Sequence, residues 1–404
     1  MRETTHMNSK ITRSSELEIP ARRSFLSKSL LMLLPLGFTP ELAAQRLPSS
    51  KAFVPPTRAR GGAVLNVRQW GARGNGDNDD TAAFQRAIDA LPAAGGTVRV
   101  PAGNYVIDPT VRVYLRSRMH LHLLPGAVLR AKRNSAERAY VLMAYKVSDV
   151  EISGGRIIGD RYNHLGSAGE WGHAIMIRGS KRVTIRDIHL SQCWGDGISI
   201  GGAMVLNRPT ISSVDVVVAN VVSTGNRRQG LTIGQAARVQ VWDSEFSNTG
   251  GIKPGAGIDI EPDPKDTGIA DTIHIENCVI KNNEGNGVIL YRPTKRVTIK
   301  KCIIERNGGY GILSIESTNA YITQNIIRNN YLMGIMFRVK TRRSQISGNT
   351  FHNNHTRLWG IRPQGGLILQ RLVGLVTGRG GTGSHIQVTN DSWDIRVTTN
   401  FYTR

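Results

Sequence analysis

Cysteine is scarce in this chain of 404 residues. Only Cys193, Cys278 and Cys302 are present, and an odd count without a CxxC spacing argues against both a disulfide framework and a structural zinc site. The apolar run from Leu30 to Phe38 is too short to cross a bilayer as a helix. The chain also lacks a basic recognition helix, zinc-finger spacing and an aromatic-plus-basic RNA-reading motif, which argues against nucleic acid as a partner.

Acidic residues are outnumbered by basic ones. The chain has 52 Lys and Arg against 30 Asp and Glu, a formal charge of +22, and residues 1–45 account for only +2 of it. A basic body favours a polyanionic partner such as nucleic acid, an anionic membrane surface or an acidic polysaccharide, because positive potential attracts and retains such ligands. We therefore expect an acidic polysaccharide as the partner. The alternative is that the arginines only form a solvated surface.

The first residues have the pattern of an export signal. Residues 21–28 (ARRSFLSK) resemble a twin-arginine signal, and a short apolar run follows them. We expect residues 1–45 to be a signal peptide, residues 46–60 to be a linker, and the protein to be periplasmic or secreted, without a transmembrane segment in the mature chain. Ala43 and Ala44 supply small residues for cleavage, but Leu42 fits a cleavage motif poorly, so an uncleaved anchor is the alternative.

A short strand that begins with glycine recurs every 23 to 33 residues. Each copy is preceded by a second strand and by a turn that carries Asn or Gly. Short strands joined by turns rather than helices, with a period of about 24 residues, predict a parallel β-helix and argue against helical repeats or a sandwich. We predict an all-β, right-handed parallel β-helix of roughly ten coils. The copies begin at Gly197, Gly230, Gly257, Gly287, Gly311 and Gly334, with an earlier copy at His173.

Two sets of residues are expected to stack inside this solenoid. Asparagines in equivalent turns could form an amide ladder that satisfies the turn backbone. Cys278 and Cys302 each lie nine residues before a repeat glycine, so we expect their thiols to stack in the core. The asparagines are Asn248, Asn283, Asn307, Asn330 and Asn354.

One amphipathic helix is predicted near the start of the body. Asp79-Asp80-Thr81 supplies N-cap chemistry, and Pro92 follows the helix. The apolar face consists of Phe84, Ala87, Ile88 and Leu91. With the flanking residues 64–72 and 96–105, this order resembles the N-terminal cap of the pectate-lyase-like β-helix superfamily. The resemblance implies that the helix plugs the open end of the solenoid.

The resemblance continues beyond the cap. Residues 155–160, 169–173 and 194–198 are similar to the polygalacturonase-like portion of the superfamily, although the adjacent Asp-Asp pair and the Arg-Ile-Lys of polygalacturonases do not appear downstream of them, and the Asp-Pro-His of alginate epimerases is absent. Lyases, hydrolases, epimerases and phage tailspikes share this fold, so the resemblance does not fix the reaction. We expect one domain over residues 61–404, with a cap at 61–110, coils at 111–355 and a tail at 356–404.

Outward positions of successive coils form rows on the surface, because side chains of a strand alternate in direction. Alignment on the glycine places Asp259 and Glu261 side by side, and such a pair needs solvent, a cation or a substrate to offset its repulsion. We predict both as catalytic residues and as ligands of a bound cation, for which Ca²⁺ is the candidate. The alternative is a solvated acidic pair. The first row contains Met176, Ser199, Thr232, Asp259, Ile289, Leu313 and Met336, and the second contains Arg178, Gly201, Gly234, Glu261, Tyr291, Ile315 and Arg338.

Two neighbouring coils carry a second candidate pair. Gly172-His173-Ala174 and Gly195-Asp196-Gly197 occupy equivalent places, which stacks His173 on Asp196 for proton transfer or for a structural hydrogen bond. Trp171 and Trp194 precede the two segments and are either platforms for sugar rings or covers of an apolar edge. The cations predicted to bind substrate are Arg178, Arg227, Arg228, Lys253 and Arg292.

These residues favour a polysaccharide lyase. In β-elimination a base removes the proton next to a uronate carboxylate while a cation neutralises that carboxylate. His173 or Tyr291 would move the proton. Arg227, Arg228 or Arg292 would bind the carboxylate. The alternatives are a glycoside hydrolase that uses Asp196, Asp259 and Glu261, a polysaccharide epimerase, and a non-catalytic polysaccharide-binding β-helix.

Overall fold

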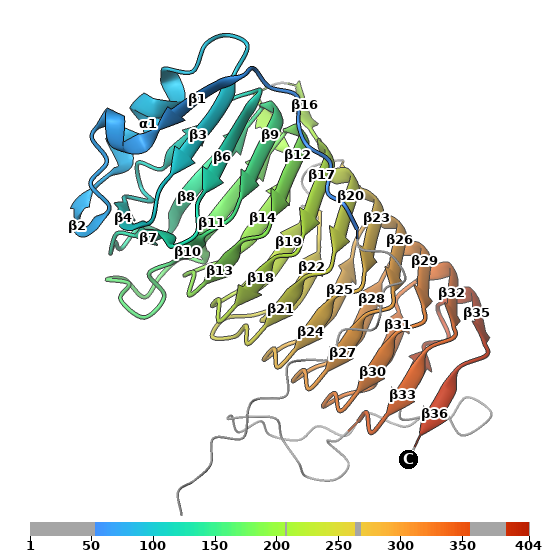
Figure 1. Cartoon of the computed structure of the whole chain (residues 1–404). Helices are drawn as coiled ribbons and strands as arrows, with labels where there is room; N and C mark the ends of the chain where they lie inside the picture. The colour runs from blue at the N-terminus through green and yellow to red at the C-terminus, as the bar shows by residue number, and fades with distance from the viewer. Residues whose placement is uncertain (1–52, 207, 263–267, 356–384, 404) are drawn as a thin grey trace, which may run out of the picture. The chain divides into compact units, whose positions relative to one another are not determined.

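The computed structural model describes residues 53–206, 208–262, 268–355 and 385–403, which belong to one compact unit, Ala44–Arg404. Three long parallel sheets run along this unit, and strands of successive coils lie side by side in each sheet (Figure 1). The right-handed parallel β-helix predicted from the glycine-led repeats is confirmed. Sheets A and B contain twelve strands each and sheet C contains ten, against the roughly ten coils expected.

Each strand of a sheet is hydrogen-bonded to the strands of the coils before and after it. Sheet A consists of β1 (Ala63–Asn66), β3 (Gly96–Val100), β6 (Met119–Leu123), β9 (Ser148–Ser153), β12 (Lys181–Arg186), β17 (Ser213–Ala219), β20 (Ala236–Trp242), β23 (Ala270–Glu276), β26 (Thr294–Lys300), β29 (Thr318–Thr323), β32 (Arg342–Ser347) and β35 (Trp393–Thr398). Sheet B consists of β2 (Asn75–Asp79), β4 (Gly103–Ile107), β7 (Ala127–Ala131), β10 (Arg156–Ile158), β13 (His189–Ser191), β18 (Val222–Thr224), β21 (Glu245–Ser247), β24 (Val279–Lys281), β27 (Ile303–Glu305), β30 (Ile326–Arg328), β33 (Thr350–His352) and β36 (Phe401–Thr403). Sheet C consists of β5 (Val113–Leu115), β8 (Arg138–Tyr145), β11 (Trp171–Arg178), β14 (Ile198–Gly201), β19 (Gln229–Ile233), β22 (Ala256–Ile260), β25 (Val288–Tyr291), β28 (Ile312–Ile315), β31 (Ile335–Arg338) and β34 (Ile386–Val388).

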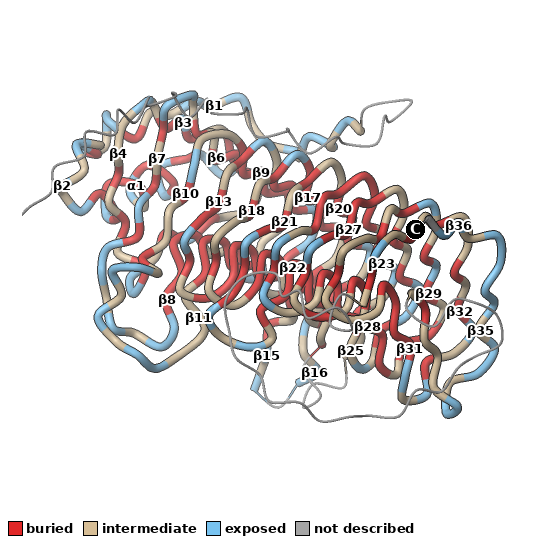
Figure 2. Tube along the Cα trace, turned by 90° about the horizontal axis from the view of Figure 1, so that it is seen from below, coloured by how far each residue is buried: buried red, intermediate tan, exposed pale blue. Residues whose placement is uncertain are grey.

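Aliphatic side chains fill the interior in rows that cross the strands. In sheet A, Ile185 pairs with Val218, Val218 with Val241, and Val241 with Ile275, and all four are fully buried. Figure 2 shows such buried positions in red, repeating from strand to strand. β-Branched residues suit this pleated surface, and their removal from water is the main force that stacks the coils.

An asparagine ladder satisfies the turns between sheets B and C. Asn283 donates its side-chain amide to Asn307 at 2.9 Å, Asn307 donates to Asn330 at 2.9 Å, and Asn330 donates to Asn354 at 2.8 Å. The prediction for Asn248 was wrong. In its coil the register gives the ladder position to Thr249, whose backbone N–H donates to Asn283, while Asn248 takes the exposed position with φ of 54° that asparagine tolerates.

The cysteines also lie where the repeat places them. Cys278 and Cys302 are buried free thiols of successive coils. Burial raises the pKa of the Cys278 thiol well above its usual value of 9.0, and the neighbouring thiol of Cys302 adds to the effect. Cys278 therefore keeps its proton, and both cysteines are buried core residues, as predicted.

The predicted cap is present as a single α-helix, α1 (Thr81–Asp89), preceded by the 3₁₀-helix η1 (Val67–Trp70). Phe84, Ala87 and Ile88 of α1 are fully buried and face the first coil. The cap chemistry comes from Asp79, whose carboxylate accepts from the backbone N–H of Thr81 at 3.0 Å. Asp80 instead accepts from the backbone N–H of Arg73 at 2.7 Å and so fixes the preceding loop.

Residues 53–60, the described part of the expected linker, form a strap across the outer face of sheet A. Figure 1 shows this strap in blue beside the strands β9, β12, β17 and β20. Phe53 stacks on Trp242 with a ring separation of 4.5 Å, Arg58 donates to Thr184 at 2.8 Å, and Arg60 forms an ion pair with Glu151 at 2.6 Å. The strap is therefore anchored at three coils.

The periphery has two further features. Between β14 and β17, the chain forms an antiparallel hairpin of β15 (Ala203–Val205) and β16 (Arg208–Ile211). Within the tail expected at 356–404, β34, β35 and β36 add one strand to each of the three sheets. The expected signal peptide at 1–45 lies outside the described residues. Within the part of the chain that the structure describes, no helix is long and apolar enough to cross a membrane.

Candidate functional site

The strand register of sheet C confirms the predicted outward rows. Met176 pairs with Ser199, Ser199 with Thr232, and Thr232 with Asp259. The neighbours of Asp259 in the chain, Ile258 and Ile260, are fully buried in the core, so Asp259 itself points to the outer face. Glu261 continues the strand, because its backbone N–H donates to the carbonyl of Ile233 at 2.9 Å.

Asp259 faces outward but is covered, with 1% of its surface exposed. Gln229 donates its side-chain amide to one carboxyl oxygen, Oδ2, and the other oxygen, Oδ1, has no partner. Burial raises the pKa of Asp259 well above its usual value of 3.8, and the nearby charge of Glu261 raises it further. Asp259 therefore keeps its proton to a higher pH than an aspartic acid in water does.

Asp196 supplies a third carboxyl group on the same face. Its side chain is fully buried and accepts hydrogen bonds from Thr232 at 2.9 Å and from the Arg228 guanidinium at 3.2 and 3.3 Å. Burial raises the pKa of Asp196 above 3.8, although Arg228 opposes this shift. Arg228 also donates to Glu170 at 3.0 Å and to Gln229 at 2.6 Å, so it connects Asp196, Glu170 and, through Gln229, Asp259 in one network.

His173 lies beside Asp196 as predicted, and its hydrogen bonds define its tautomer. The backbone N–H of Asp196 donates to Nδ1 of His173 at 2.9 Å, so the ring proton must be on Nε2. Nε2 is buried and has no partner. Burial, with the charges of Arg178 and Arg228, lowers the pKa of His173 well below 6.5. The ring is a neutral hydrogen-bond donor, and Tyr140 stacks on it at 5.4 Å.

The other predicted cations form no ion pair with these carboxyl groups. Arg178 donates to the Ser199 hydroxyl at 3.0 Å, in the outward row itself, and burial lowers its pKa to about 10. Arg292 pairs with Glu316 at 3.2 Å and lies 5.4 Å from the ring of Tyr291. Lys253 is exposed on the loop before β22. Only Arg228 among the predicted cations forms ion pairs with the carboxyl cluster of Asp196 and Glu170.

The two tryptophans differ in what covers them. Trp194 is stacked with His164 at 4.0 Å, and the Arg227 guanidinium lies 3.6 Å from the same ring. These contacts leave the ring little free face for a sugar. The guanidinium of Arg138 lies 4.0 Å from the ring of Trp171. Both rings thus contact arginines, Arg227 in the turn before β19 and Arg138 at the first residue of β8.

Family models match most of the described body. Residues 64–260 match the model described as rhamnogalacturonase A/epimerase, pectate lyase-like, and residues 265–371 match the right-handed β-helix region model. The first match contains the cap, His173, Asp196 and Asp259. Residues 64–260 are therefore similar to the pectate-lyase-like family, and the described body is a right-handed parallel β-helix.

Two relatives of this pectate-lyase-like chain illustrate how local the sequence similarity is. A prophage-derived uncharacterised protein of Bacillus subtilis, YorA, is 32% identical over 223 residues, which are 49% of this chain and 38% of that protein. An exo-poly-α-D-galacturonosidase of Dickeya chrysanthemi is 42% identical over 84 residues, or 20% of this chain and 13% of that enzyme. The chain therefore matches well under half of the length of these relatives.

A solved structure has the same fold. The A-module of the mannuronan C-5 epimerase AlgE6 of Azotobacter vinelandii superimposes with a TM-score of 0.60 at 22% sequence identity, covering 72% of this chain and 77% of that module. At this identity the likeness concerns the fold. The carboxyl cluster must be interpreted from this chain's own geometry.

Three members of the cluster were not predicted as site residues: Gln229, Thr232 and Glu170. Thr232 and Gln229 were detectable in principle, because the register places Thr232 between Ser199 and Asp259 and Gln229 on the strand next to Asp259. Their amide and hydroxyl groups connect Asp196 to Asp259. Glu170 reaches Arg228 from a loop with no repeat equivalent, and no pattern in the sequence signals that contact.

The predicted cation site has few ligands. Among the residues that the structure describes, no group of three or more His, Cys, Asp or Glu side chains could hold a metal ion. Asp259 and Glu261 alone supply two carboxyl groups, whereas Ca²⁺ usually takes six or more oxygen ligands. Within the cluster, the Arg228 guanidinium supplies the positive charge.

Proposed function

We propose that this chain is an exported enzyme that acts on a uronate-containing polysaccharide along the outer face of sheet C. The excess of basic residues supports an acidic polymer, and the Dickeya galacturonosidase and the Azotobacter epimerase act on such polymers by their names. The residues expected to perform the reaction are Asp196, Asp259 and Glu261, with Arg228 and His173 as their organising partners.

The observation that carries the proposal is the buried carboxyl group of Asp259, which lies beside Glu261 and is connected to Asp196 through Gln229 and Thr232. A carboxylic acid whose pKa is raised by burial and by a second carboxyl group keeps its proton to higher pH and can act as a general acid. Glycoside hydrolysis requires such an acid for the departing oxygen, together with a second carboxyl group. In this scheme the Asp259–Glu261 pair supplies the acid through Glu261, its more exposed member, and Asp196 supplies the second group. This geometry favours hydrolysis, the reaction that the sequence had placed second.

β-Elimination is the second candidate, because the face also carries Arg228 and Arg178 beside the carboxyl groups. A lyase would use one guanidinium to neutralise a uronate carboxylate. In the structure Arg228 is bound by Asp196 and Glu170, and His173 is a neutral donor rather than a free base. Epimerisation shares the proton-removal step and has the same requirements.

Products separate the three reactions. Purified protein is incubated with polygalacturonate, polymannuronate and other acidic polysaccharides, and new reducing ends are measured together with the ultraviolet absorbance of unsaturated uronates. Reducing ends without that absorbance support hydrolysis. Both signals together support the lyase. A changed uronate composition without either signal supports the epimerase, and no change with any polymer contradicts the proposed enzyme.

Glu261→Gln tests the site itself. Loss of the carboxyl group proposed as the general acid is expected to lower kcat by about 100-fold or more, the usual contribution of such a group. The matched control is Glu245→Gln, because Glu245 lies on sheet B and pairs with Lys281 at 3.3 Å. Unchanged turnover in Glu261→Gln would remove the cluster as the active site.

A further inference from the structure

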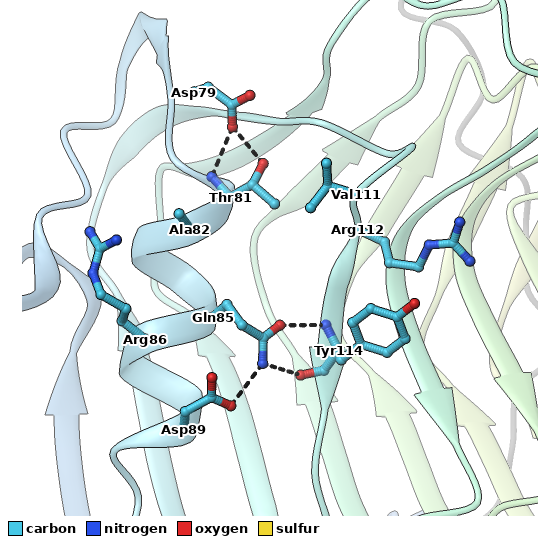
Figure 3. Close-up of a pocket in the computed structure, with 9 residues that line it drawn as sticks. All are labelled: Asp79, Thr81, Ala82, Gln85, Arg86, Asp89, Val111, Arg112 and Tyr114. Atoms are coloured by element: carbon cyan, nitrogen blue, oxygen red, sulfur yellow. Dashed lines mark hydrogen bonds between the residues drawn. The ribbon is translucent and has the colours of Figure 1, made fainter.

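A hollow lies at the N-terminal end of sheet C, between α1 and the edge strand β5 (Figure 3). Its volume is about 740 Å³, within the range of pockets that bind small molecules. The wall on the α1 side carries Arg86 and Asp89, and the wall on the β5 side carries Val111, Arg112 and Tyr114. None of these residues belongs to the carboxyl cluster.

The chemistry of this hollow suits a sugar residue. The Tyr114 ring is 46% exposed and Val111 is 61% exposed, so both present apolar surface to the hollow. The guanidinium of Arg112 lies 5.9 Å from the centre of the Tyr114 ring, and Asp89 and Arg86 line the hollow from α1. An aromatic face flanked by side chains that donate and accept hydrogen bonds is the combination that recognises a ring with vicinal hydroxyl groups.

The walls of the hollow are fixed in place. Gln85 accepts from the backbone N–H of Tyr114 at 2.9 Å and donates to the carbonyl of Tyr114 at 3.3 Å, as Figure 3 shows. Gln85 also donates to Asp89 at 2.9 Å. One side chain of α1 thus closes the open edge of sheet C and sets the orientation of both walls, so a ligand would find a preformed site.

The hollow lies in line with the carboxyl cluster. Tyr114 pairs with Met143, Met143 with Met176, and Met176 with Ser199, in the outward row that reaches Asp259. A contact chain runs beside this row, because Arg112 lies 4.8 Å from the ring of Tyr140, which stacks on His173. Five strand spacings separate Tyr114 from Asp259, or about 24 Å.

We propose that the hollow between α1 and β5 is a distal subsite that binds a sugar residue of the same polysaccharide while another part of that chain occupies the carboxyl cluster. This inference rests on the proposed function. A polymer that spans both places gains contacts that a short oligosaccharide cannot make. The protein is therefore selective for chains long enough to cover about five coils.

The test measures dissociation constants for oligogalacturonates and oligomannuronates of increasing length by calorimetry, with the whole chain in the Glu261→Gln background to prevent turnover. Affinity is expected to rise in a step at the length that reaches from the cluster to the hollow. Tyr114→Ala is expected to abolish the step and weaken the long ligands about five- to tenfold, while short ligands bind unchanged. Tyr114→Phe keeps the ring and the step.

The matched control is Tyr321→Ala, which removes a tyrosine of similar exposure, 44%, from sheet A. It should leave the step intact. Asp89→Asn is a second variant at the hollow if Tyr114→Ala fails to fold, and it should weaken long ligands alone. Affinity that does not depend on length, or an equal loss for short and long ligands, would overturn the subsite but leave the proposed function standing. Failure of every oligosaccharide to bind would contradict the proposed function itself.

Discussion

Sheets A and C each bury carboxyl groups on their outer faces, and the pKa values of these groups are shifted in opposite directions on the two faces. On sheet A, Glu151 is fully buried and pairs with Arg60 at 2.6 Å and with Arg186 at 2.7 Å. Burial opposes its ionisation, but the neighbouring His120 and the guanidinium groups of Arg186 and Arg60 together outweigh burial and hold the pKa of Glu151 below 4.5. On sheet C, Asp259 is equally buried, yet its pKa is raised.

The difference lies in the partners. Glu151 has two arginines, and its neighbour His120 is neutral at pH 7 because burial lowers the His120 pKa to about 4. Asp259 has an amide and a second carboxyl group, and its oxygen Oδ1 has no partner. A buried carboxylate whose charge is compensated by cations has a structural role. A buried acid without such partners destabilises the folded state, and it marks a functional site.

The largest effect is expected from removing the compensation on sheet A. The double variant Arg60→Ala/Arg186→Ala leaves Glu151 buried without a cation, and breaking a buried ion pair in this way costs about 3–5 kcal/mol. Chemical denaturation should show this loss of unfolding free energy. Addition of Glu151→Gln should recover part of it, since the uncompensated charge is then gone.

An exposed pair on the same sheet provides the control for that variant. Arg238 pairs with Asp215, and more than a third of each side chain is exposed. Arg238→Ala should leave the denaturation midpoint unchanged, because solvent screens such pairs. Equal losses from the exposed pair and from the buried pair would remove the distinction between the two kinds of carboxyl group on which the comparison rests.

A smaller effect is a difference between the two faces in how the free energy of unfolding depends on pH. Asp259 holds its proton more tightly when folded, so between its usual value of 3.8 and its raised folded pKa the native state binds more protons and stability falls as pH rises, by up to about 1.4 kcal/mol per pH unit. Glu151 behaves in the opposite way, because its folded pKa is lowered and stability falls as pH drops below 4.5.

Asp259→Asn and Glu151→Gln isolate these two contributions. In urea unfolding across the acid and neutral range, Asp259→Asn should gain stability relative to the unmodified protein as pH rises. Glu151→Gln should approach the stability of the unmodified protein as pH falls. Parallel pH profiles for the two variants would show that the two carboxyl groups are compensated alike.

The repeat explains why the fold could be predicted and the site only in part. Glycine-led strands recur in six successive coils, so alignment placed Asp259 beside Thr232 and His173 beside Asp196, and the structure confirms both placements. These contacts join equivalent positions of neighbouring coils. Each of these contacts can be predicted from the coil period and the alternation of side chains along a strand.

Contacts that leave the repeat could not be predicted in this way. Arg60 reaches Glu151 from a strap 91 positions earlier in the chain, and Arg228 reaches Glu170 over 58 positions. The burial of Asp259 could not be predicted either, because it depends on the side chains that cover the outer face of sheet C and not on the position of Asp259 in its outward row. Arg227 and Arg292 lie in coils adjacent to the cluster, but their side chains contact other partners. Arg227 lies over the ring of Trp194, and Arg292 forms an ion pair with Glu316.

The smallest effect is expected at Trp194, where the two interpretations from the sequence differ most clearly. With His164 at 4.0 Å and Arg227 at 3.6 Å from its ring, Trp194 holds the turn rather than a sugar. Trp194→Ala should therefore lower the unfolding free energy by about 1–2 kcal/mol through lost stacking and cation–π contacts, with little change in KM. Glu261→Gln should show the reverse, a large loss of kcat with little change in stability. A KM increase of tenfold or more in Trp194→Ala at unchanged stability would restore this ring as a substrate platform and extend the binding face of sheet C into the turn that precedes β14.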